Sequence, residues 1–143
     1  MAESKWLSPR SCFEPPEPIS TTDWSLPAIS TLPERDFHPE HSHFSVREAV
    51  SLLESTAPGN ESLVVCHGDY CPPNVLLEDW DPVGFLDLGE LGVADRWWDL
   101  AIATWSLDWN LGPGYEGVYL DEYEIERDDR RISFYRLLYD LTS

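Results

Sequence analysis

The chain has 143 residues, the size of one domain, and 42% of them are hydrophobic, which is enough to build a single core. Its formal net charge of −18 argues against partners such as nucleic acid or anionic lipid; it favours a cationic ligand or, as the alternative, a general role in solubility. No apolar run is long enough to span a membrane, no apolar leader is visible, and an odd, low cysteine count favours the reducing cytoplasm.

Residues 1–44 are expected to form an irregular, proline-rich segment. They hold seven of the twelve prolines and show little periodicity. The only lysine of the chain, Lys5, lies here. The pattern becomes regular from Ser45 onward, so residues 45–143 are predicted to form the folded domain.

A helix is predicted to begin after Ser45. Ser45 and Glu48 fit a capping box, in which each side chain accepts a hydrogen bond from the backbone of the other. Apolar residues then recur at helical spacing at Val46, Ala49, Val50 and Leu53. A turn cluster at residues 57–60 predicts that the helix ends near Thr56.

Short strands and further helices follow. Three apolar runs are predicted to be strands: residues 63–66, 75–77 and 83–86. Three helical patterns come after them: from Ala94 to a break at residues 111–114, then 115–125 and 129–141. The first of these helices is apolar almost all round, which predicts that it is buried.

The loop between the first two strands carries the candidate chemistry. Asp69 is an acceptor-only carboxylate that can take the proton of a hydroxyl group, and the amide oxygen of Asn74 is a ligand that magnesium accepts. Pro72 and Pro73 stiffen the backbone between them. If the second and third strands form a hairpin, Asp87 folds back beside Asn74. One Asp for the proton, with one Asn and one Asp for Mg²⁺, is the set that phosphoryl transfer uses.

Turn formation is the ordinary explanation for Asp, Asn, Gly and Pro in such places. The joint pattern H-G-D-x-x-x-x-N, flanked by apolar runs and followed by an apolar run ending in D-x-G, is much more specific than any of its parts. A zinc site built from Cys66, Cys71 and the histidines of "HPEHSH" is disfavoured, because the spacing fits no usual ligand pattern.

From about Leu63 to the end, the chain resembles the aminoglycoside phosphotransferases, most of all the aminoglycoside 3′-phosphotransferases, or kanamycin and neomycin kinases. Besides the loop, the resemblance includes "LGVADRWWDLAIAT" and "FYRLLYD". It implies an α+β, mostly helical fold: the C-terminal lobe of a protein-kinase-like fold, with a small β-hairpin carrying the catalytic loop. It also implies Mg²⁺-dependent transfer of the γ-phosphoryl group of ATP to a hydroxyl of a small cationic, aminoglycoside-like substrate.

The resemblance assigns roles to the loop residues. It implies that Asp69 is the catalytic base, that Asn74 and Asp87 bind magnesium and that His67 supports the loop. Asp95 and Asp99 are then structural acids near a helix start. The nucleotide, ATP or GTP, stays open, and nothing in the sequence fixes the oligomeric state.

Three further acids are substrate-binding candidates. Asp140 corresponds to a C-terminal acid that holds ammonium groups in the family, and Glu116 adds negative charge. Glu90, in Gly89-Glu90-Leu91-Gly92, stands where 3′-type members often have an arginine. For any single acid, a solvated helical face is the alternative.

A complete member of the family also has an N-terminal lobe, with a β-sheet, a phosphate-covering loop and a lysine that pairs with the nucleotide phosphates. That lobe is expected to be missing, and the fragment is expected to be inactive alone. A G-x-G-x-x-G motif at residues 112–117 follows a helix, which predicts a turn and not a nucleotide loop. The alternatives to an aminoglycoside kinase are a non-catalytic remnant or pseudoenzyme, and a kinase-like phosphotransferase for another small hydroxyl compound.

Overall fold

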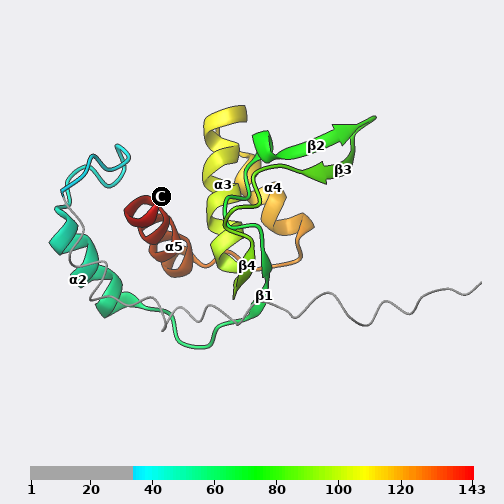
Figure 1. Cartoon of the computed structure of the whole chain (residues 1–143). Helices are drawn as coiled ribbons and strands as arrows, with labels where there is room; N and C mark the ends of the chain where they lie inside the picture. Colours follow the sequence, from blue (N-terminus) through cyan, green and yellow to red (C-terminus); the bar gives the residue numbers. More distant parts are fainter. Residues whose placement is uncertain (1–33) are drawn as a thin grey trace, which may run out of the picture.

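A computed structural model describes residues 34–143 of the chain. Most of the proline-rich segment, including Lys5, therefore lies outside the described residues. Residues 34–45 form turns and irregular backbone with neither helix nor strand. In the described part, four α-helices and two small antiparallel sheets make up a mixed α and β fold (Figure 1).

Helix α2, Val46–Thr56, begins as the sequence predicts. The backbone nitrogen of Ser45 donates to Glu48 Oε2 over 2.9 Å, and that of Glu48 donates to Ser45 Oγ over 3.3 Å. The four predicted apolar positions, from Val46 to Leu53, are all buried. They face helix α5, Asp129–Thr142, so the periodicity of the sequence identifies the packed side of the helix.

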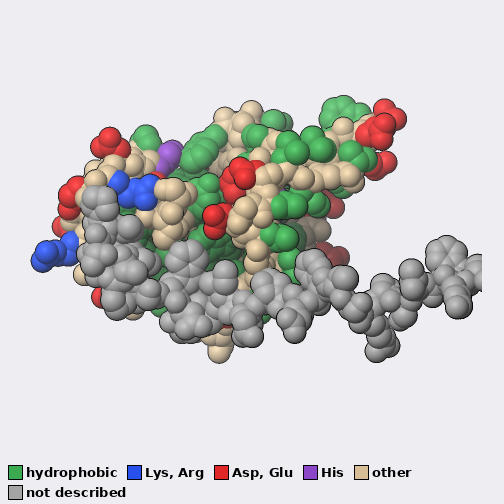
Figure 2. All heavy atoms as spheres, viewed as in Figure 1, with side chains coloured by type: hydrophobic (Ala, Val, Ile, Leu, Met, Phe, Trp, Pro, Cys, Tyr) green, Lys and Arg blue, Asp and Glu red, His purple; other side chains and the backbone are tan. Residues whose placement is uncertain are grey.

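Two sheets of two strands each flank the loop at residues 67–74. Strand β1, Leu63–Cys66, pairs with β4, Gly92–Asp95, while β2, Val75–Glu78, pairs with β3, Asp81–Phe85. The β2–β3 pair is the predicted hairpin, and it projects away from the helices (Figure 1). Apolar side chains cover much of this hairpin and acidic ones lie at its tip (Figure 2).

The helical part of the core is built around α3, Trp97–Leu111. Nearly every residue in its first three turns is buried, and it packs against α5 and against α4, Tyr115–Glu122. Leu100, Ala101 and, from α5, Tyr135 and Leu141 are almost inaccessible to solvent. Within residues 34–143, no helix is long and apolar enough to cross a membrane.

The helix predicted to begin at Ala94 begins at Trp97 instead. Residues 92–95 are extended because they pair with β1, a partner that lies about thirty residues earlier and is invisible to local periodicity. The third strand covers residues 81–85 and not 83–86. Helix α4 ends at Glu122, before the predicted Ile125, and Glu124 adopts a left-handed backbone with φ of 58°.

The glycine motif at residues 112–117 runs from the cap of α3 into the first turn of α4, at the predicted turn between two helices. Gly112, with φ of 91°, caps α3, and Gly114, with φ of 108°, precedes the first residue of α4. Both are left-handed positions that favour glycine. The motif is therefore a helix-to-helix turn.

Candidate active site

Residues 67–74 connect β1 to β2, and the first turn of α3 anchors them. The backbone nitrogens of His67 and Gly68 donate to the two carboxylate oxygens of Asp99, over 2.7 and 3.0 Å. The indole nitrogen of Trp98 donates to the Gly68 carbonyl over 2.7 Å. Burial raises the pKa of Asp99, although the two backbone donors act in the opposite direction. Asp99 is thus a structural acid, in the role that the family resemblance implies.

Gly68 allows the loop to pass close to the segment after the hairpin. Its φ is 94°, and a Cβ atom at this position would lie 2.3 Å from Cβ and 2.6 Å from the carbonyl oxygen of Glu90. Only a residue without a side chain fits such an approach. The close contact joins the loop that carries Asp69 to the segment that follows Asp87.

Asp69 lies at the centre of a hydrogen-bond network. The phenol of Tyr139 donates to Asp69 Oδ1, and the side-chain nitrogen of Asn74 donates to Asp69 Oδ2, both over 3.0 Å. The same nitrogen donates to the Asp69 backbone carbonyl over 3.0 Å. Because the Asn74 nitrogen faces Asp69, its carbonyl oxygen is turned away from that carboxylate. Burial, followed by the hydrogen bond to Asp69, raises the pKa of Tyr139, which keeps the phenol a donor.

His67 ties the loop to the end of the hairpin. Its Nδ1 accepts from the backbone nitrogen of Asp69 over 3.3 Å, so its Nε2 carries the proton and donates to the Leu86 carbonyl over 2.8 Å. The side chain is buried. His67 therefore orients the backbone around Asp69 and Leu86 and does not face solvent.

Asp87 follows immediately after this junction. The backbone nitrogen of Leu86 donates to the Asn74 carbonyl over 2.9 Å, so the hairpin brings the segment carrying Asp87 next to Asn74. Asp87 is exposed and left-handed, with φ of 54°. Burial, then the charge of Asp69 and in smaller part that of Asp87, raises the pKa of the Cys71 thiol. Asp69 and Asp87 therefore both lie close enough to the Cys71 thiol for their charges to affect it.

The three candidate substrate acids are placed differently. Asp140 accepts from the His38 backbone nitrogen over 3.0 and 3.2 Å and pairs with His41 Nδ1 at 2.7 Å. Glu116 forms ion pairs with Arg127 at 2.8 Å and with Arg136 at 3.0 Å. Glu90 is exposed beside Gly68. Asp140 and Glu116 are therefore already partnered within the chain, whereas Glu90 faces solvent.

Sequence reasoning missed two features near the site. The first is Tyr139, which reaches Asp69 from a helix 70 residues further along the chain. The second is an aromatic cluster beside Asp140, where the His38 ring lies 4.6 Å from that of Trp105 and 4.5 Å from that of Trp109. The one sequence signal for Tyr139 is that it directly precedes Asp140, a candidate substrate acid. Across residues 34–143, no three His, Cys, Asp or Glu side chains are grouped so as to hold a metal ion.

The chain is similar to a known protein family and to several of its members. The model of the phosphotransferase enzyme family matches residues 22–135. The chain belongs to this family. Among curated relatives, the aminoglycoside 3′-phosphotransferase of Streptomyces fradiae is 40% identical over 114 residues, covering 72% of this chain and 41% of the relative. The streptomycin 3″-kinase of Streptomyces griseus is 41% identical over 87 residues, covering 55% and 32%.

Solved structures give the same family. An aminoglycoside-3′-phosphotransferase of type VIII superposes with a TM-score of 0.72 at 29% identity, over 88% of this chain and 52% of that one. The aminoglycoside phosphotransferase APH(3″)-Id of Streptomyces rimosus, in complex with ADP and streptomycin, gives 0.70 at 27% identity, over 96% and 57%. The predicted family and its kinase-like fold are thus confirmed. The chain spans roughly half the length of these solved structures. It spans less than half the length of the curated relatives.

Proposed function

We propose that the chain carries the catalytic loop of an ATP-dependent phosphotransferase that phosphorylates a hydroxyl group of a cationic, aminoglycoside-like substrate. One arrangement carries the proposal: Asn74 donates to Asp69, and the hairpin backbone brings Asp87 alongside Asn74. The names of the relatives and the ADP in one solved neighbour support the same reaction class. Residues 45–143 would then correspond to the catalytic-loop lobe of a kinase-like fold.

Within this proposal Asp69 is the general base. Its carboxylate is only partly buried, and Tyr139 and Asn74 fix its orientation from either side. A substrate hydroxyl within hydrogen-bond reach would pass its proton to one of these oxygens as the phosphoryl group arrives. His67 acts as a positioning residue, because both of its ring nitrogens are engaged with the backbone around the site.

Asn74 and Asp87 fit a magnesium ion by their donor types. An amide oxygen that faces away from Asp69 and an exposed carboxylate are hard oxygen ligands, and Mg²⁺ usually takes only one or two carboxylates together with phosphate oxygens. When bound, the ion neutralises phosphate charge. The ligand roles require the Asn74 and Asp87 oxygens to come within about 4 Å of each other, because magnesium–oxygen bonds are about 2.1 Å.

On the substrate side, Asp140 near the end of α5 suits an ammonium group. His38 contacts both the Asp140 carboxylate and the ring of Trp109, an exposed side chain that can pack against a sugar ring. Asp108, in α3, has a buried Oδ1 atom without a hydrogen-bond partner among residues 34–143. Glu90 adds an exposed carboxylate near the loop. Glu116 contributes least in this proposal, since two guanidinium groups already balance its charge.

The substrate class is tested by titration calorimetry with kanamycin. We expect modest affinity, because exposed ion pairs contribute only about 0–1 kcal/mol each, and weakening as salt screens them. Asp140→Asn should weaken binding more than Glu3→Gln, which removes the same charge far away in the sequence. Equal effects of the two substitutions would show that only the overall charge matters.

The reaction is tested by transfer of labelled γ-phosphate from ATP to kanamycin. The chain has one lysine, Lys5, and spans less than half the length of the curated relatives, so we propose turnover well below the roughly 1–100 per second of kinases. Asp69→Asn should reduce that turnover by at least about 100-fold, the contribution of a general base. Asp79→Asn, at the exposed hairpin tip, is the control. Equal rates for Asp69→Asn and wild type would favour the non-catalytic remnant.

A further inference from the structure

A cavity borders the loop at Tyr70, away from the groups proposed for phosphoryl transfer. It has a volume of about 390 Å³ and is bounded by β1, by Tyr70, by the first turn of α3 and by α4 with the residue after it. Asp69, Asn74 and Asp87 do not line it. Its volume lies within the range of small-molecule sites, roughly 300–1,000 Å³.

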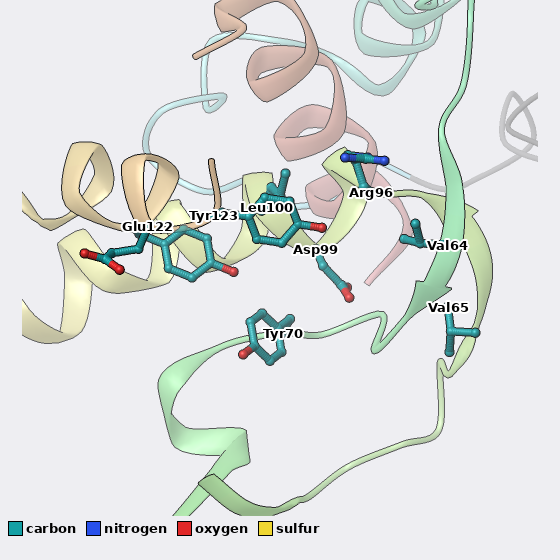
Figure 3. Close-up of a pocket in the computed structure, with 9 residues that line it drawn as sticks. Val64, Val65, Tyr70, Arg96, Asp99, Leu100, Glu122 and Tyr123 are labelled. Carbon is teal, nitrogen blue, oxygen red and sulfur yellow. The ribbon is translucent and has the colours of Figure 1, made fainter. Parts of the chain in front are cut away.

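Three phenol rings line this cavity: Tyr70 from the loop, and Tyr119 and Tyr123 from the α4 side. In Figure 3, Tyr70 and Tyr123 approach the space between them from these two different elements. No two of the three rings form an aromatic pair in the described part of the chain; Tyr70 is paired with His67 and Phe85 instead, at 6.0 and 6.1 Å. The three rings therefore do not stack on one another, and all three line the cavity.

The cavity is also electronegative. Asp99 and Glu122 both line it. Burial raises the pKa of Tyr70 and of Tyr119, and the negative charge of Asp99 raises both further. The phenols thus stay neutral, with their electron-rich faces intact, in a region that the acids make favourable for positive charge.

One cation, Arg96, lines the same cavity and has to be accounted for. Its Nε and Nη2 donate to the Ser62 hydroxyl over 3.0 and 2.6 Å, which holds the guanidinium at the β1 end. In Figure 3 it lies beside Val64, at the opposite end from Glu122 and Tyr123. The half of the cavity formed by Tyr70, Tyr123 and Glu122 therefore has no cationic side chain in its lining.

From this arrangement we infer that the cavity is a binding site for a small organic cation of the methylated-ammonium type. Such a cation gains from aromatic faces on several sides and from a nearby carboxylate, and it loses little on leaving water because its charge is diffuse. A phosphate or other anion is excluded by Asp99 and Glu122. This site is separate from the phosphoryl-transfer site and does not depend on the function proposed above.

Occupation of the cavity would reach the catalytic loop through two residues. Tyr70 directly follows Asp69, and Asp99 accepts the backbone hydrogen bonds of His67 and Gly68. A cation bound here touches the loop at Tyr70 and not at Asp69 or Asn74. It would be an effector of loop geometry and not a substrate.

The test uses choline as the probe and 3,3-dimethylbutan-1-ol as its neutral counterpart of the same shape, with binding to the full chain followed by NMR titration. Choline should shift the resonances of Tyr70 and Tyr123 and bind at least about tenfold more tightly than the alcohol. Tyr123→Leu should weaken choline binding about threefold or more, the loss of one cation–π face of about 0.5–1 kcal/mol. Tyr115→Leu, an exposed tyrosine of α4 outside the cavity, should leave it unchanged.

The charge is tested with neighbouring acids. Glu122→Gln should weaken choline binding, while Asp121→Asn, beside it but outside the lining, and Asp140→Asn, at the other site, should not. All of these residues except Asp140 are exposed, so the variants should fold, and circular dichroism checks this. Equal binding of choline and the alcohol, or equal losses in the three acid variants, would overturn the inference. If kanamycin phosphorylation failed while choline still bound here, only the proposed function would fall.

Discussion

Replacing Gly68 by alanine should destabilise the whole domain, because at this residue the loop of residues 67–74 passes close to the segment after the hairpin. A left-handed backbone costs a non-glycine residue roughly 1–2 kcal/mol. The added Cβ would lie 2.3 Å from Glu90 Cβ and 2.6 Å from its backbone oxygen, so a backbone segment has to move. Overpacking of this kind costs typically about 1–3 kcal/mol. Together these effects give a loss of about 2–5 kcal/mol.

Urea unfolding followed by tryptophan fluorescence measures this loss as a lower midpoint at unchanged slope. Gly117→Ala is the matched control. It lies within α4, and a Cβ there meets no atom within 4 Å, so alanine should add about 0.5–1 kcal/mol by favouring the helix. If Gly68→Ala unfolded within about 0.5 kcal/mol of wild type, the loop could not be held against Glu90 in the way described.

Further predictions concern two buried groups, Asp95 and Cys66. Asp95 is fully buried and accepts from Arg131 at 2.9 Å, so Asp95→Ala should lower the free energy of unfolding in urea by about 3–5 kcal/mol. Asp129→Ala, which removes an exposed ion pair, should lower it by less than about 1 kcal/mol. Similar losses in both would contradict the buried pair. Iodoacetamide should label Cys71 before Cys66, whose burial raises the pKa of its thiol to about 12. The unfolded thiol ionises near its ordinary pKa of 9.0, so the free energy of unfolding should fall from pH 9 towards 12. Cys66→Ala should flatten this dependence on pH. An unchanged dependence in Cys66→Ala would contradict the assignment of this effect to Cys66.

The parts of the fold that the sequence predicts are those written in local signals. The capping box at Ser45 and Glu48 needs only four residues, and α2 begins where it indicates; the turn cluster at residues 57–60 marks its end at Thr56. The β2–β3 hairpin follows from two apolar runs with a short acidic turn between them. The loop from His67 to Asn74 is recognisable because its residue types occur together at fixed spacing.

The parts that were missed depend on contacts between distant segments. Strand β4 is extended because it pairs with β1, and its four residues carry no strand pattern that outweighs the helix after them. Tyr139 reaches Asp69 across 70 positions, and His41 reaches Asp140 across 99. A single sequence does not encode such partnerships in its spacing. For the same reason Asp140 could be named as an acid but not as one that is already paired.

The most direct test of the central claim is a titration of the full chain with Mn²⁺ and ADP, observed by paramagnetic broadening of assigned amide signals. If Asn74 and Asp87 hold the metal that serves Asp69, broadening should concentrate on these three residues in wild type and disappear from them in Asp87→Asn. Asp81→Asn, an exposed acid in the same hairpin, should behave as wild type. Broadening spread over the acidic surface, or the same in Asp87→Asn as in wild type, would contradict the proposed phosphoryl-transfer site.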